Sequence, residues 1–135
     1  MAYPLSFRVR YDYKPSDRDI NVPVSLSAGP VTVKLFAKVD TGADHCLFER
    51  GFAEALQLEV EHGTPLNFST VTGEFRAYGH EVTLAVLGVE VHALVYFFAN
   101  AKFTRNVLGR NGWLNRVRLG LVDHDSVVYL SSYDE

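Results

Sequence analysis

Apolar and polar residues alternate along several parts of the chain, and this pattern predicts a protein built mainly of β-strands. Residues 6–13, SFRVRYDY, place Phe7, Val9 and Tyr11 on one face and Arg8 and Arg10 on the other. Alternation with a period of two is typical of a strand that is buried on one side. Residues 126–132, SVVYLSS, predict a last strand near the C-terminus.

Three pairs of β-rich segments surround turn residues, and each pair predicts a hairpin. Residues 20–27 and 31–39 are separated by Ala28-Gly29-Pro30. Residues 64–79 predict two strands around a turn at Thr72-Gly73, and residues 81–99 predict a second hairpin with its turn near Gly88.

Two segments have helical spacing instead. In residues 48–58, FERGFAEALQL, the apolar positions Phe48, Phe52, Ala55 and Leu56 predict a helix of two or three turns at most. Residues 106–117, NVLGRNGWLNRV, start apolar and break at a glycine. We expect a second short helix there, near residues 111–118.

Length and composition indicate one globular domain over residues 1–135. The chain has 135 residues, of which 47% are hydrophobic, enough for a core. No repeat or linker divides it, and residues 14–19 are the loosest segment. We find neither a signal-peptide pattern nor an apolar run long enough to cross a membrane, and Cys46 is the only cysteine. We therefore expect a cytoplasmic protein that makes no contact with membranes.

The charges do not indicate a nucleic-acid partner or a metal. The net charge is −3 and the lysines and arginines are scattered, so we expect no binding of nucleic acid. No two histidines have close metal-ligand spacing, and there is a single cysteine, so we expect no metal and no cofactor. His45 and Cys46 are adjacent, but neighbours in a strand point to opposite faces, so Cys46 is interpreted as a small core residue rather than a nucleophile.

The segment most suggestive of chemistry is Asp40-Thr41-Gly42, which occurs once. An apolar segment that ends at Val39 precedes it, and a predicted helix follows. A strand that ends in a tight turn can hold a carboxylate on a rigid element. The alternative is an ordinary polar turn after a strand.

A second segment changes that balance. Residues 106–114, NVLGRNGWL, have two apolar residues followed by Gly-Arg-Asn. Together with residues 40–44, DTGAD, this segment resembles the retropepsin-like aspartic proteases, the family of the retroviral proteases. A hairpin with a glycine at its tip lies between the two motifs, at the place of the family's flap. The resemblance spans roughly residues 31–117, and residues 1–19 are an N-terminal extension outside it.

The resemblance implies an all-β fold, a retropepsin-like acid-protease half-barrel with a flap hairpin and one or two short helices. It implies that Asp40 is the catalytic aspartate and that the Gly42 carbonyl binds the substrate backbone. It also implies that the Thr41 hydroxyl bonds to the same loop of a second chain. Asp44 and Arg110 resemble a charged pair that braces the loop against the C-terminal helix. An arginine fork suits a carboxylate well.

The substrate-binding residues that the resemblance implies lie in three places. Two of them, Ala43 and Asp44, follow the Asp-Thr-Gly triplet, and Leu108 lies on the apolar strand beside the loop. The remaining ones form the flap tip, where only the glycine matches the family's glycine-rich pattern: Val71, Thr72, Gly73, Glu74 and Phe75.

Aspartic protease chemistry needs two carboxylates, and a second copy of the chain is the simplest source of the other one. The two Asp40 residues would share a proton across a two-fold axis, activate a water molecule and hydrolyse a peptide bond. Rival carboxylates in the same chain are Asp44, Asp123 and Asp125. We prefer the dimer, because Asp44 is expected to pair with Arg110 and the other two are expected in a polar turn.

The sequence therefore predicts a homodimeric aspartic endopeptidase whose partners are itself and an extended peptide or protein substrate. The alternative is a non-catalytic module, dimeric or monomeric, that keeps the fold and binds peptides or proteins. Fold alone does not secure function. Asp40 carboxylates that meet in a dimer would favour catalysis, and loops that face apart would favour the module.

Overall fold

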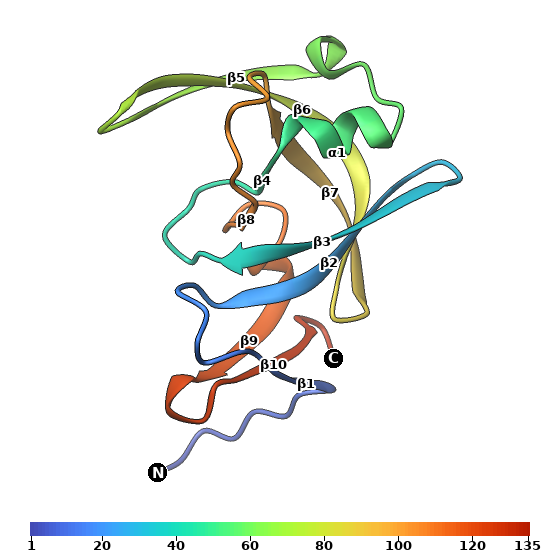
Figure 1. The fold of residues 1–135 in the computed structure, drawn as a ribbon. Helices are drawn as coiled ribbons and strands as arrows, with labels where there is room; N and C mark the ends of the chain where they lie inside the picture. The colour runs from blue at the N-terminus through green and yellow to red at the C-terminus, as the bar shows by residue number, and fades with distance from the viewer.

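A computed structural model describes residues 1–135 as ten strands, one α-helix and three short 3₁₀ turns (Figure 1). The strands are β1 (Val9–Asp12), β2 (Asn21–Ala28), β3 (Val31–Val39), β4 (Leu47–Phe48), β5 (Thr64–Thr70), β6 (Gly73–Val86), β7 (Val89–Phe98), β8 (Val107–Leu108), β9 (Val117–Val122) and β10 (Val127–Ser132). The helical elements are α1 (Arg50–Ala55), η1 (Val60–His62), η2 (Leu114–Arg116) and η3 (Asp123–Asp125).

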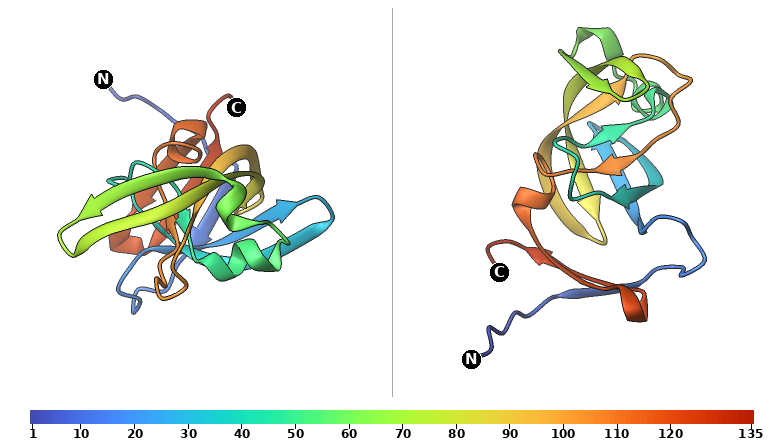
Figure 2. Two further views of the ribbon diagram at one scale, coloured as in Figure 1. Left: turned by 90° about the horizontal axis from the view of Figure 1, so that it is seen from above. Right: turned by 90° about the vertical axis from the view of Figure 1, so that its left-hand side faces the viewer.

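The larger sheet closes on itself. Its seven strands have the order β2-β3-β8-β4-β7-β6-β5, and β2 also pairs with β6. The ring of six strands leaves β5 outside, as the free strand of a hairpin with β6 that projects from the body (Figures 1 and 2). Strand β5 pairs only with β6, so its outer edge is unpaired.

Strand β6 connects the two halves of the ring. Its N-terminal part pairs with β5 from Gly73 to Gly79, and its C-terminal part pairs with β2 from Thr83 to Val86. The turn to β7 is two residues, Leu87 and Gly88, and both have positive φ. That geometry matches the twist of a tight hairpin.

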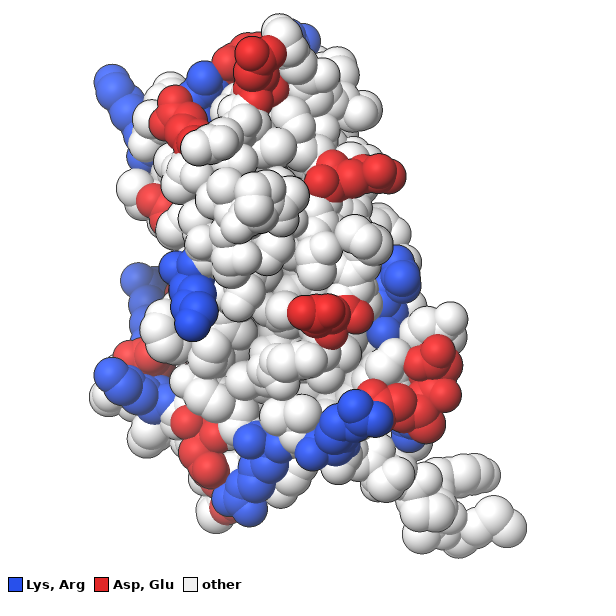
Figure 3. All heavy atoms as spheres, turned by 90° about the vertical axis from the view of Figure 1, so that its right-hand side faces the viewer, with Lys and Arg blue, Asp and Glu red and all other residues white.

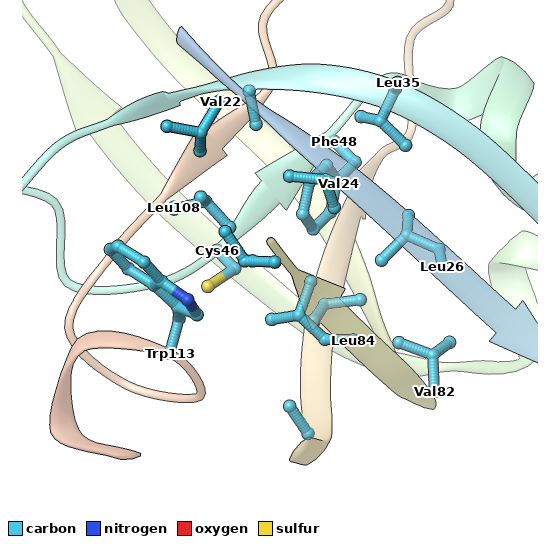
Figure 4. Close-up of a cluster of buried hydrophobic side chains, with 14 of the residues drawn as sticks. Val22, Val24, Leu26, Leu35, Cys46, Phe48, Val82, Leu84, Leu108 and Trp113 are labelled. Atoms are coloured by element: carbon cyan, nitrogen blue, oxygen red, sulfur yellow. The ribbon is translucent and has the colours of Figure 1, made fainter. Parts of the chain in front are cut away.

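Period-two alternation places the core inside the ring. In β2 the alternate residues Val22, Val24 and Leu26 are 0–3% exposed. They pack in one hydrophobic cluster with Phe48 and Leu84 (Figure 4). Burial of one such side chain contributes about 1.5–3 kcal/mol, so the alternation itself supplies much of the drive to close the sheet.

The chain ends form a separate three-stranded sheet of order β1-β10-β9, which lies below the ring in Figure 1 and at the lower end in the right-hand view of Figure 2. It joins the main core through Val128 and Leu130, which belong to the same hydrophobic cluster as β2. The Tyr13 hydroxyl also donates a hydrogen bond to the Asp123 carboxylate. The sheet thus extends the fold beyond the part that the sequence motifs cover.

The all-β prediction is confirmed, together with the three hairpins and the helix after the Asp-Thr-Gly triplet. The second short helix, predicted near residues 111–118, is present as the single 3₁₀ turn η2 and not as an α-helix. Gly112 has φ +99° and Trp113 has φ −133° and ψ −66°, so no α-helix can form there. Only the turn η2 remains, and β9 begins at Val117, where the sequence analysis placed no strand.

Acidic and basic side chains are interspersed on the face that Figure 3 shows, and neither sign forms a continuous surface there. No helix of this chain has the length and apolar character that a bilayer crossing needs.

Candidate active site

The loop that carries Asp-Thr-Gly begins where strand β3 ends, beside the parallel strand β8. Strand β3 ends at Val39, whose register partner in β8 is Leu108. The next residue, Asp40, donates its backbone amide to the Leu108 carbonyl at 3.0 Å. The backbone of Asp40 is thus fixed by the sheet, as the sequence predicts for a carboxylate at a strand end.

The Asp40 carboxylate has one hydrogen bond within the chain. The Gly42 amide donates to its Oδ1 at 3.1 Å, and Oδ2 has no partner. The side chain is half-buried, whereas Thr41 and Gly42 are exposed. One carboxylate oxygen is therefore free to meet a group from outside this chain.

Gly109 allows the two motifs to approach. A Cβ at this position would lie 2.3 Å from the His45 carbonyl oxygen and 2.7 Å from the Ala43 carbonyl oxygen. Both are backbone atoms, so a side chain at this position would force the main chain to shift. The close approach lets Arg110 donate its amide to the Ala43 carbonyl at 2.8 Å.

The predicted ion pair between Asp44 and Arg110 is not formed, and that expectation is corrected. Both side chains are exposed, and neither has a salt-bridge partner in the chain. Backbone bonds connect the segments instead: the Asn111 amide and its side-chain Nδ2 both donate to the Asp44 carbonyl, at 2.9 and 2.8 Å. These hydrogen bonds connect the loop to the Gly109 segment without the predicted charged pair.

A pocket of about 270 Å³ lies between the Asp40 loop and the β5–β6 hairpin. Of the predicted site residues, Asp40, Ala43, Thr72 and Phe75 line it. The others do not: Thr41, Gly42, Asp44, Val71, Gly73, Glu74, Leu108 and Arg110. Leu108 is fully buried in the core. The sequence analysis missed these lining residues: Leu47, Phe68, Thr70, Phe98, Phe103, Arg105 and Val107.

Four phenylalanines form one wall of this pocket. Phe75 and Phe103 meet edge to face with ring centroids 4.3 Å apart, and Phe98 lies 5.3 Å from Phe103. Phe68 packs against Phe75 at 5.7 Å. We call these residues the Phe cluster. Phe68 and Phe75 are cross-strand partners in the predicted hairpin, so exact register would have placed that pair from sequence. No local pattern points to Phe103.

Residues 99–106, which carry Phe103 and Arg105, are attached at both ends to the start of α1. The Glu49 amide donates to Asn106 Oδ1 at 3.0 Å, and Asn106 Nδ2 donates to Glu49 Oε2 at 2.6 Å. At the other end Arg50 donates to the Ala99 carbonyl at 2.9 Å. We call residues 99–106 the pocket loop.

The Arg50 side chain is itself held by carboxylates. It forms a two-pronged ion pair with Glu61, at 2.5 and 2.7 Å, and a longer contact with Glu54. The hydrogen bond to Glu61 raises the pKa of Arg50, and the same bond lowers the pKa of Glu61. A planar fork in this geometry orients the guanidinium toward the pocket loop.

Cys46 lies in the core behind the loop. It is 0% exposed, and its side chain lies in the cluster with Trp113 (Figure 4). The Gly109 amide donates to its sulfur at 3.4 Å. Burial raises the pKa of the thiol to about 11. A protonated, buried thiol is a poor nucleophile, which agrees with its interpretation as a core residue.

The rival carboxylates lie elsewhere. Asp123 and Asp125 belong to η3, beside the terminal sheet, and Asp44 is not among the residues that line the pocket. Asp40 is therefore the one carboxylate that lines the pocket. No group of three or more histidine, cysteine or acidic side chains is placed to hold a metal ion.

Sequence comparison shows the family to which this chain belongs. Residues 22–112, from β2 through the Gly109 segment, match the family described as aspartyl protease. The match covers more than half of the chain and includes Asp-Thr-Gly and Gly-Arg-Asn, so the chain belongs to the aspartyl protease family, and this membership supports a protease activity. A sequence comparison with curated proteins gives no significant match.

Two solved structures have a similar fold. A retropepsin-like aspartic protease from Rickettsia conorii aligns with a TM-score of 0.60 and 17% identity, over 85% of this chain and 92% of its own. EIAV protease in complex with the inhibitor HBY-793 aligns with a TM-score of 0.55 and 18% identity, over 74% of this chain and 88% of its own. Both support the retropepsin-like fold.

Proposed function

We propose that this protein is an aspartic endopeptidase that acts as a homodimer, with one catalytic aspartate, Asp40, from each chain. The observation that carries the proposal is that the pocket contains a single carboxylate, and that its Oδ2 has no partner in the chain. A dyad needs two such groups in contact. Closed two-fold symmetry is the commonest way to bring two identical loops together.

The chemistry then follows from two like charges at close range. Both carboxylates cannot ionise together, so the pair shares one proton and titrates as a unit. The ionised Asp40 accepts a proton from a bound water molecule, which attacks the peptide carbonyl carbon. The protonated Asp40 of the other chain donates to the carbonyl oxygen. The tetrahedral intermediate collapses when the leaving nitrogen receives a proton.

The substrate is an extended peptide that lies between the Asp40 loop and the β5–β6 hairpin, which acts as the flap. Strand-like main-chain hydrogen bonds are the usual means of holding such peptides. In this arrangement the Gly42 carbonyl accepts from the substrate backbone, and the Thr41 hydroxyl bonds to the partner's loop. The shared core of both sheets supports treating residues 1–135 as one protease domain.

The test is cleavage of a peptide library by the wild type and by Asp40→Asn. We expect the variant to fold and to lose turnover, because an amide can neither share the proton nor act as a base. The matched control is Asp125→Asn, which removes a rival carboxylate on an exposed turn and should keep wild-type activity. Activity that survives in pure Asp40→Asn would refute the assignment.

A further inference from the structure

The pocket contains one cation, Arg105, and the proposed chemistry does not use it. Arg105 lines the pocket together with Asp40, Val107 and the Phe cluster. It also lines the adjoining surface hollow with Lys38 and Asp19. The guanidinium is therefore located where a bound peptide would leave the apolar pocket.

This guanidinium has no partner within the chain. Arg105 makes no salt bridge and no side-chain hydrogen bond, although Lys38, its neighbour in the hollow, pairs with Asp19 at 3.5 Å. Asp40 lies in the same pocket but not within ion-pair distance of Arg105. A charged fork held beside an apolar wall and left unpaired is free to bind an incoming carboxylate in two-pronged geometry.

The backbone that carries Arg105 is held in position. Asn106, the next residue, exchanges two hydrogen bonds with Glu49, and Phe103 packs against Phe75 at 4.3 Å. A binding group on a restrained segment loses less conformational entropy when its partner arrives. The position of Arg105 thus meets a physical requirement for selecting among substrates.

We propose that Arg105 determines substrate specificity: the protein selects peptides that combine a bulky apolar side chain with an acidic residue two positions away. In an extended chain, residues i and i+2 share a face and lie roughly 6.6 Å apart. The apolar side chain occupies the Phe cluster, and the carboxylate on the same face reaches Arg105. This inference rests on the proposed protease function and adds to it the class of substrate.

The test uses one extended peptide with phenylalanine as the anchor and Glu, Gln or Lys two positions away, in otherwise identical sequences. We expect wild-type kcat/KM to favour Glu over Gln by roughly 3- to 10-fold, the range for a partly exposed charge-assisted contact, and to lose much of that preference at high salt. Arg105→Gln should remove the preference, and Arg105→Glu should reverse it in favour of Lys. Lys102→Gln, which alters an exposed cation of the pocket loop outside the pocket lining, is the matched control and should change nothing.

A binding measurement separates this inference from the protease proposal. The three peptides are titrated against Asp40→Asn, with and without Arg105→Glu, by fluorescence anisotropy. If the wild type cleaves no peptide, but Asp40→Asn binds the Glu peptide best and Arg105→Glu reverses that order, the protease proposal fails and the role of Arg105 stands. If peptides are cleaved or bound without regard to charge, or if Arg105→Glu keeps the wild-type order, the role of Arg105 is overturned.

Discussion

Glu49 and Asn106 hold each other through two hydrogen bonds, from the Glu49 amide to Asn106 Oδ1 and from Asn106 Nδ2 to Glu49 Oε2. They are separated by 57 residues in the sequence. The contact joins the start of α1 to the end of the pocket loop, immediately before β8. It therefore links the core helix to the residues that shape the pocket.

The first prediction follows from this contact. Asn106→Ala should lower the free energy of unfolding by about 1–3 kcal/mol, because the Glu49 amide and carboxylate lose their partner in a part-buried site. It should also raise KM for a cleaved peptide more than it lowers kcat. Urea unfolding and steady-state kinetics measure the two effects. Glu49→Gln keeps both hydrogen bonds possible and should stay close to wild type; an equal loss in both variants would show that charge, not positioning, matters.

The second prediction concerns the close approach at Gly109. Gly109→Ala should destabilise the fold by about 1–3 kcal/mol or more, because the new methyl group would collide with the backbone carbonyls of His45 and Ala43. The matched control is Gly51→Ala in α1, where a Cβ meets nothing within 4 Å. That change should stabilise by about 0.5–1 kcal/mol. Thermal melts that shift alike for both variants would contradict the packing argument.

The third prediction tests whether two chains share one site. Wild type and Asp40→Asn are mixed in equal amounts and allowed to exchange subunits. If each active site needs both Asp40 residues, activity per total chain falls to about a quarter of that of pure wild type, since only dimers of two wild-type chains work. If each chain has a complete site, activity falls to about half. Sedimentation at the assay concentration gives the dimer content needed to read the result.

The fourth prediction is a pH dependence that comes from Cys46. Burial raises the pKa of its thiol from 9.0 to about 11. The folded state then keeps the proton over a range in which the unfolded state has lost it. The free energy of unfolding is therefore unaffected by the thiol below pH 9 and falls as the pH rises from 9 to 11. The loss is up to about 3 kcal/mol, at roughly 1.4 kcal/mol per pH unit.

Urea unfolding of the wild type and Cys46→Ala between pH 7 and pH 11 measures this difference. The wild type should lose more stability with pH than the variant, whatever their absolute difference at pH 7. Tyr13, whose pKa is raised to about 12 by its hydrogen bond to Asp123, destabilises both proteins alike at high pH and cancels in the comparison. Parallel curves would show that the Cys46 thiol has the same pKa in the folded and unfolded states.

Local sequence patterns were sufficient to predict much of the fold. Alternation over residues 20–27 placed Val22, Val24 and Leu26 in the core, because side chains in a strand point to opposite faces in turn. The glycines at the hairpin tips have positive φ, which a sequence signals directly. The position of Asp40 at the end of β3 was predictable for the same reason: strand, turn and helix signals are all short-range.

Only the tertiary structure decided how these pieces meet. That β6 runs unbroken through two hairpins and pairs with β2, and that residues 117–122 form a strand, depends on partners distant in sequence. The connection between the Asp44 and Arg110 segments was also not predicted: hydrogen bonds to backbone carbonyls join them, and the expected ion pair is not formed.

The pocket shows this division most clearly. The sequence by itself determined the candidate catalytic carboxylate, since Asp-Thr-Gly is a contiguous motif after a strand. Phe68, Phe98 and the pocket loop with Phe103 and Arg105 are three segments that no local period connects. Strand register places the first two, and hydrogen bonds from Glu49 and Arg50 hold the loop beside them. A motif can specify which group is positioned for chemistry, but long-range packing decides which side chains surround it, because pairing register is set by the burial of the whole sheet.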